Sequence, residues 1–137
     1  MNEKKYILMS IKPQYAEVIK SGEKTVELRR VAPNAHPGDI VVIYESSPVK
    51  RITSYFEIDS IYRETPDELW DKLGQNACIS KESFDTYFTA KDVACGIKIK
   101  NVALLSTPFK LSNLSKSITA PQSYRYITKE DFLGLLR

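Results

Sequence analysis

Short apolar runs separated by turn residues predict the elements of the first third of the chain. A strand is expected at residues 6–11, and a helix should begin at Pro13 because proline suits the first helical position. Gly22 should end that helix, and residues 25–30 predict a second strand. The continuous β-branched run at residues 40–44 is typical of a strand buried on both faces.

Two longer strands are expected further along the chain. Residues 51–63 alternate between apolar and polar side chains, so one face of this strand should lie in the core and the other in water. Residues 93–105 alternate in the same way, but the alternation slips near Asn101, as a β-bulge would cause. Strands of this length can bend around a small barrel.

Three short helices are expected beside these strands. Thr65 begins a capping box followed by proline and acidic residues, which predicts a helix running to Gly74. A second helix should follow Ser80, and Thr128 should cap a last short helix at the end of the chain. Alternating strand-helix-strand units are absent, so the pattern predicts a mixed α+β fold and not a doubly wound parallel sheet.

Length and composition predict one globular domain over residues 1–137. Hydrophobic residues make up 42% of the chain and charged residues 27%, which excludes a wholly disordered protein. No apolar run approaches the roughly 18–20 residues that a membrane helix needs, and the first residues lack the features of a secretory signal. A soluble, cytoplasmic protein without membrane contact is therefore expected.

The few cysteine and histidine residues argue against metal or cofactor chemistry. Cys78 and Cys95 are isolated from each other and are expected to be reduced, mostly buried thiols. His36 is the single histidine, so neither a zinc cluster nor a Ser-His-Asp triad has the residues it needs. We expect no metal and no cofactor.

The formal net charge is +3, and its distribution along the chain is uneven. Both ends of the chain are basic, whereas the middle is acidic, with Arg63 the one basic residue between Glu57 and Asp71. The acidic stretch should repel phosphate, and a basic surface built from the two ends could attract it. An ordinary solvated surface explains the same distribution.

The densest polar cluster lies at residues 21–30, where the first helix meets the second strand. Glu27 and Arg29 are two positions apart and should project from one face of the strand, with Val26 and Leu28 directed to the core. Lys24 has the wrong parity for that face, so it joins them only if the preceding turn extends through it or the strand is bulged. An exposed pair worth ~0–1 kcal/mol would have the same spacing.

These residues resemble the opening of ASCH-domain proteins of the PUA-like superfamily, whose signature is GxKxxExR. Gly22, Lys24, Glu27 and Arg29 match its four named positions. The resemblance implies a small PUA-like β-barrel of mixed and antiparallel strands with flanking short helices. It also implies a cleft, lined by these four residues, that takes RNA, a nucleotide or a nucleoside.

The roles implied for the motif suit its side chains. Lys24 supplies a point charge for a phosphate or carbonyl oxygen, and Arg29 offers a planar fork to a phosphate or base edge. Glu27 can accept a hydrogen bond from an exocyclic amine, and the two neighbouring cations should hold its carboxylate ionised.

Four residues outside the motif are further candidates for binding. Tyr15 and Tyr44 could stack on a base, although both suit a hydrophobic core equally well. Tyr124 and Arg125 lie in a segment resembling one near the end of some family members, and they could close the cleft. A surface loop that tethers the last helix is the alternative for that segment.

The family also contains hydrolases, which leaves a catalytic alternative open. Its acetylcytidine amidohydrolases carry a threonine at the position of Glu27, so this chain departs from their pattern. Other members are ribonucleases, in which a Lys/Glu/Arg cluster could serve as base and phosphate clamp without a metal. The preferred hypothesis is a binding domain; the alternatives are a metal-independent hydrolase using Lys24 and Glu27, or a protein-interaction module.

Overall fold

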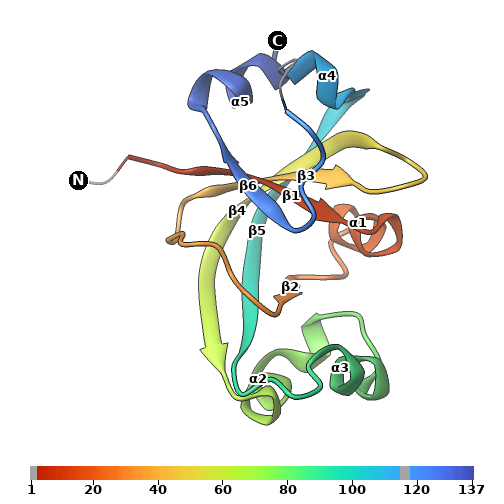
Figure 1. Ribbon diagram of the computed structural model, residues 1–137, viewed down its shortest axis with the longest axis vertical. Helices are drawn as coiled ribbons and strands as arrows, with labels where there is room; N and C mark the ends of the chain where they lie inside the picture. Colours follow the sequence, from red (N-terminus) through yellow and green to blue (C-terminus); the bar gives the residue numbers. More distant parts are fainter. Residues whose placement is uncertain (1–2, 115–117) are drawn as a thin grey trace.

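The computed structural model describes residues 3–114 and 118–137. It has one six-stranded sheet and several short helices (Figure 1). The strands are β1 (Tyr6–Ile11), β2 (Val26–Arg29), β3 (Ile40–Glu45), β4 (Arg51–Glu64), β5 (Ala94–Phe109) and β6 (Tyr124–Ile127). The helices are α1 (Pro13–Lys20), α2 (Pro66–Leu73), a 3-10 turn η1 (Gly74–Asn76), α3 (Lys81–Tyr87), α4 (Leu111–Leu114) and α5 (Lys129–Leu135).

The sheet is mixed and runs in the order β2-β5-β4-β3-β1-β6. β1 and β3 are parallel, and every other neighbouring pair is antiparallel. The sheet curls into a half-barrel, which confirms the predicted α+β, PUA-like class. Within the described ranges its edge strands, β2 and β6, do not pair with each other, so the half-barrel has an open side.

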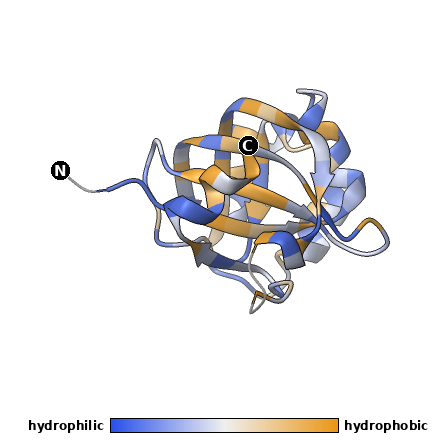
Figure 2. Cartoon of the chain, turned by 90° about the horizontal axis from the view of Figure 1, so that it is seen from above, coloured by the Kyte–Doolittle hydropathy of each residue, from blue (hydrophilic) through white to orange (hydrophobic). Residues whose placement is uncertain are grey.

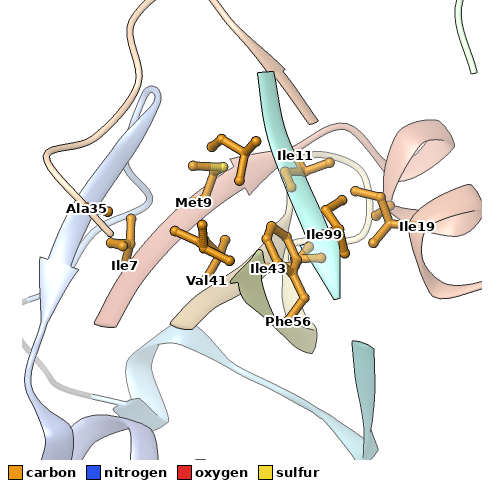
Figure 3. Packing of buried hydrophobic residues seen from close by; sticks show 12 residues of the cluster. Ile7, Met9, Ile11, Ile19, Ala35, Val41, Ile43, Phe56 and Ile99 are labelled. Carbon is orange, nitrogen blue, oxygen red and sulfur yellow. The ribbon is translucent and has the colours of Figure 1, made fainter. Parts of the chain in front are cut away.

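Apolar side chains from several strands and α1 fill the inside of the curled sheet. Figure 2 shows hydrophobic residues along the strands, and Figure 3 shows how the buried side chains of this cluster point toward one another. β3 is buried over its whole length, as its continuous apolar run predicts. The labelled members of this core are Ile7, Met9, Ile11, Ile19, Ala35, Val41, Ile43, Phe56 and Ile99.

The long strands β4 and β5 bend, and a bulge accompanies the bend. Their pairing register shifts in several places, and Asn101 has a positive φ of 53°. The predicted irregularity at Asn101 is therefore confirmed. β5 continues to Phe109, beyond the predicted end at residue 105, because the bulge changes the alternation without ending the strand.

Helices α4 and α5 lie at one end of the molecule and α2 and α3 at the other, with α1 between the two groups (Figure 1). At one end, α2 and α3 cover β2 with a second apolar cluster that includes Leu28, Leu69 and Phe84. At the other end, α5 packs Phe132 and Leu135 against the sheet. Side chains of Thr65, Ser80 and Thr128 cap the three helices as predicted.

α1 is fixed to the sheet by a buried ion pair as well as by apolar contacts. Lys20 Nζ lies 2.7 Å from Glu45 Oε2, and Thr53 Oγ1 donates to the same oxygen at 2.5 Å. Glu45 is only 3% exposed, so this carboxylate is well satisfied by partners inside the protein. The contact holds α1, and Tyr15 with it, against β3.

Several sequence expectations differ from the structure. The pattern did not predict β6 or α4, because a four-residue edge strand and a four-residue helix carry too few periodic positions. Cys78 was expected to be mostly buried but is exposed, whereas Cys95 is buried as expected. Of the residues that the structure describes, none belongs to a helix long and apolar enough to span a membrane.

Candidate functional site

A cleft of about 1050 Å³ lies at the open side of the half-barrel. Its walls come from β2, the ends of β1 and β3, α1, α3 and the segment before β6. Its charged and aromatic lining residues are Lys12, Tyr15, Lys24, Glu27, Arg29, Arg30, Tyr44, Lys50, Glu82, Tyr87 and Tyr124. The cleft therefore contains three motif residues and three of the four further candidates.

The turn between α1 and β2 places Lys24 in the cleft. Gly22 has a φ of +89°, a conformation that glycine adopts without strain. It follows the C-terminal end of α1 and turns the chain toward β2. The amide of Lys24 donates to Val18 O at 2.9 Å, so the turn extends through Lys24 and the strand begins at Val26. Strand parity does not apply to Lys24, which explains how it joins the side chains of β2. Gly22 shapes this turn and does not line the cleft.

β2 separates the core from the cleft by simple alternation. Val26 and Leu28 are buried in the cluster beneath α2 and α3, as predicted. Glu27 and Arg29 lie on the opposite face, where Arg29 Nη1 is 3.1 Å from Glu27 Oε2. Their side chains are only 8% and 11% exposed, so this pair differs from the exposed, weakly coupled pair that the spacing also allowed.

Arg29 also bridges the open side of the sheet. Its guanidinium donates to Ser10 O of β1 at 3.3 Å and to the Ser123 hydroxyl just before β6. Ser10 reinforces this segment, because its amide donates to Ser123 O at 2.9 Å and its hydroxyl to Pro121 O at 2.6 Å. Arg29 thus joins edge strand β2 to the β1/β6 edge and is held rigidly by three acceptors.

Lys24 is a buried amine with unusual surroundings. It is 3% exposed, and its Nζ donates to Ala77 O at 2.5 Å and lies 5.2 Å from the centre of the Tyr15 ring. Burial lowers the pKa of Lys24, and the nearby Glu27 and Cys78 oppose this effect. A lysine whose pKa is lowered gives up a proton more readily than an exposed one.

Burial raises the pKa of Glu27, even though Lys24 and Arg29 both act to lower it. The expectation that these cations hold the carboxylate ionised describes their effect correctly but omits burial, which is the larger effect and acts in the opposite direction. The sequence showed the two positive charges but not the removal of Glu27 from water, which is the larger effect. A carboxyl group with a raised pKa can accept and release a proton closer to neutral pH.

The other candidates occupy different places. Tyr15 and Tyr124 are half-buried residues of the cleft wall. Tyr44 also lines the cleft but is 6% exposed and packs within the apolar cluster near α5. Arg125 is exposed and does not line the cleft. Successive residues of β6 project to opposite faces, so Arg125 points away from the face on which Tyr124 lines the cleft.

Several residues that the sequence analysis did not single out belong to the cleft. Tyr87 of α3 accepts a hydrogen bond from Arg30 Nε at its carbonyl, 2.7 Å away, and the Arg30 guanidinium lies 4.2 Å from its ring centre. Burial raises the pKa of Tyr87. Exposed Lys12 and Lys50 stand at the rim. The basic N-terminal part of the sequence hinted at Lys12, Arg30 and Lys50, whereas no charge pattern indicated Tyr87.

The described part of the chain brings no three His, Cys, Asp or Glu side chains together in a group that could hold a metal ion. The motif brings a buried carboxyl group, a buried amine and a fixed guanidinium to the cleft. Such a set can clamp an anion and exchange protons with it.

Comparisons with known proteins agree with this architecture. The ASCH domain model matches residues 9–103. A protein of Zymomonas mobilis named "ASCH domain-containing ribonuclease" is 27% identical over 132 residues, which cover 94% of this chain and 88% of that protein. The crystal structure of ASCH from Zymomonas mobilis superposes with a TM-score of 0.91, covering 98% of this chain and 95% of that one at 27% identity.

A further match reaches a longer protein. Large ribosomal subunit protein uL22 of Ureaplasma parvum is 27% identical over 124 residues, which cover 88% of this chain and 39% of that protein. The family match extends over most of the sheet and includes the motif at residues 22–29. The chain belongs to the ASCH domain family.

Proposed function

We propose that the chain binds single-stranded RNA in the cleft at the open side of the half-barrel. The observation that carries the proposal is the combination of Lys24, Arg29 and rim lysines with aromatic walls in one cavity of about 1050 Å³. Positive charge attracts the phosphate backbone, and aromatic side chains stack on unpaired bases. The ribonuclease name of the Zymomonas mobilis relative supports RNA as the class of ligand.

The two parts of the cleft suit the two parts of a nucleotide. Exposed Lys12 and Lys50 can follow a phosphate backbone at the rim without losing their hydration. Deeper in the cleft, the half-buried ring of Tyr15 offers a stacking surface for a base. Glu27 and Arg29, held by their mutual contact and by Ser10, can then read the polar edge of that base.

Binding can be tested with labelled single-stranded oligonucleotides and fluorescence anisotropy. Lys12→Ala with Lys50→Ala should weaken binding, since both side chains are exposed at the rim and their loss should leave the fold intact. Lys91→Ala is the matched control, because this lysine is exposed and outside the cleft. Affinity that is unchanged in the double variant, or equally reduced in the control, would contradict the proposal.

Cleavage of the bound RNA by transesterification is the second candidate function, and the position of the buried Glu27 carboxyl beside Arg29 in the cleft, with its raised pKa, favours it. In this mechanism Glu27 takes the proton of a ribose 2′-hydroxyl as that oxygen attacks the neighbouring phosphorus. A 2′,3′-cyclic phosphate forms, the bond to the 5′-oxygen breaks, and Lys24 supplies a proton to that leaving oxygen. Arg29 stabilises the negative charge on the phosphoryl oxygens.

The hydrolase candidate predicts cleavage that persists in the presence of a metal chelator. Glu27→Gln should abolish the product, since an amide cannot take the proton, and a 2′-O-methyl strand should remain intact because it has no 2′-hydroxyl to attack the phosphorus. N4-acetylcytidine should not be turned over, because Glu27 stands where the amidohydrolases carry threonine. Absence of any product from unmodified RNA would leave the binding function alone.

A further inference from the structure

A second cavity of about 680 Å³ lies at the other end of the β1/β6 edge. It is lined by the start of β1 and the end of β6, whereas the cleft is lined by the end of β1 and the start of β6. The antiparallel strand β6 therefore leads from one cavity to the other. The residues that line the second cavity are Glu3, Lys4, Lys5, Tyr6, Asn34, Tyr126, Ile127, Lys129 and Glu130.

Two tyrosines on one face of β6 connect the cavities. Tyr124 lines the cleft and Tyr126 lines the second cavity, and their ring centres are 6.2 Å apart in an edge-to-face arrangement. The segment after β2 follows the same course, because Val31 lines the cleft and Asn34 the second cavity. The two cavities therefore lie next to each other along β6, with residues 31–34 beside this strand.

The surroundings of Tyr126 combine an exposed aromatic ring with positive charge. The side chain is 45% exposed, and Lys5 Nζ lies 6.0 Å from its ring centre. Lys5 is itself fixed by a 2.8 Å hydrogen bond to Asn34 O, while Lys4 and Lys129 are exposed. Three lysines against two glutamates leave the cavity mildly positive.

The hydroxyl of Tyr126 has a structural role that must be separated from any binding role. It accepts a hydrogen bond from the Asn34 amide at 2.9 Å and is 3.3 Å from Asn34 O, to which it donates. These contacts hold the loop after β2 beside β6. Only the hydroxyl makes these hydrogen bonds, so replacing Tyr126 with phenylalanine removes them and keeps the aromatic ring.

We propose that Tyr126, with Lys4, Lys5 and Lys129, forms a second nucleotide-binding subsite for the same RNA strand. This inference rests on the proposed function of the cleft and specifies its ligand as a strand of several nucleotides. One base stacks on the Tyr126 ring, and the lysines contact the phosphates on either side of it. The strand continues past Tyr124 into the cleft.

Strand length and the identity of residue 126 together test the subsite. The probes are 2′-O-methyl oligoribonucleotides, which bind without offering a 2′-hydroxyl for cleavage. Tyr126→Ala should weaken binding of an octanucleotide by roughly 5- to 150-fold, the range for loss of one base-aromatic stack. It should leave binding of a dinucleotide, measured by chemical-shift titration, unchanged. Tyr126→Phe should retain octanucleotide affinity, because the ring remains.

The outcomes separate the subsite from the cleft. If Tyr126→Phe loses as much affinity as Tyr126→Ala, the residue acts by holding the loop at Asn34 and the subsite is refuted. If Tyr126→Ala binds the octanucleotide as tightly as wild type does, and both proteins also bind the dinucleotide, then the cleft function stands and the subsite is refuted. If wild type binds no strand of any length, the proposed function itself fails. Lys4→Ala with Lys129→Ala, both exposed positions, repeats the test if Tyr126→Ala does not fold.

Discussion

At the scale of single residues, Glu27 and Lys24 show how burial opposes charge pairing. The two groups attract each other electrostatically, yet burial raises the pKa of the acid and lowers that of the amine. Both shifts favour the neutral form of each group, because water is largely excluded from both. In this motif burial therefore acts on the ionisation of both groups more strongly than the attraction between them does.

The raised pKa of Glu27 predicts a measurable pH dependence of stability. The folded protein holds this proton more tightly than the unfolded chain, in which the carboxyl has its ordinary value of 4.5. Stability from this group is therefore complete below pH 4.5 and is lost as pH rises through the raised value. We expect Glu27→Gln to remove this decline, measured as melting temperature against pH.

The control for this measurement is Glu82→Gln, which replaces an exposed carboxyl group of the same cleft. It should leave the pH profile of the wild type unchanged. A Glu27→Gln profile parallel to that of the wild type would show that Glu27 titrates alike in the folded and unfolded states.

At the scale of elements, the four residues of β2 contribute to both the core and the cleft. One face packs under α2 and α3, and the other carries Glu27 and Arg29 into the cleft. The strand is held by antiparallel pairing to β5 and by the turn at Gly22. The geometry of the site therefore depends on the packing of the opposite face.

Leu28→Ala should destabilise the protein by about 2–5 kcal/mol, the range for removing a buried leucine side chain. Leu28 is 7% exposed and packs in the cluster beneath α2 and α3. The matched control is Val31→Ala, because Val31 is 64% exposed just beyond the same strand and should change stability by less than about 0.5 kcal/mol. Denaturant unfolding measures both, and similar losses would show that β2 is not packed as described.

At the scale of the whole molecule, the open side of the curled sheet determines where the cleft lies. β2 and the β1/β6 edge leave a gap that Arg29 spans through Ser10 and Ser123. The cleft lies on this side, with rim lysines from distant parts of the chain, and the second cavity lies next to it along β6. The acidic stretch between Glu57 and Asp71 contributes no residue to either lining.

This distribution of charge predicts a salt dependence of RNA binding. Affinity should fall as salt concentration rises, since each phosphate contact releases counterions, with a slope of about 0.7 per contact on logarithmic axes for a single strand. Lys50→Ala should reduce the slope by about 0.7, and Lys91→Ala should not change it. A wild-type affinity independent of salt would show that phosphate contacts do not hold the ligand.

The sequence by itself determined most of the elements, though not β6 or α4, and the facing of the residues in β2. Hydrophobic alternation predicted that Val26 and Leu28 enter the core, and the capping residues Thr65 and Thr128 marked their helices. The motif also identified the family from four positions within eight residues. These features depend on neighbouring residues, so they are readable from a short stretch of chain.

Only the tertiary structure decided how the site is assembled and how its groups ionise. Ser123 contacts Arg29 across 94 positions of sequence, and the short strand β6 that follows it has no clear pattern of its own. The direction of the Glu27 pKa shift also reversed the expectation from its charged neighbours. Contacts of this kind depend on the path of the whole chain, and burial depends on everything that surrounds a residue, neither of which is present in local sequence.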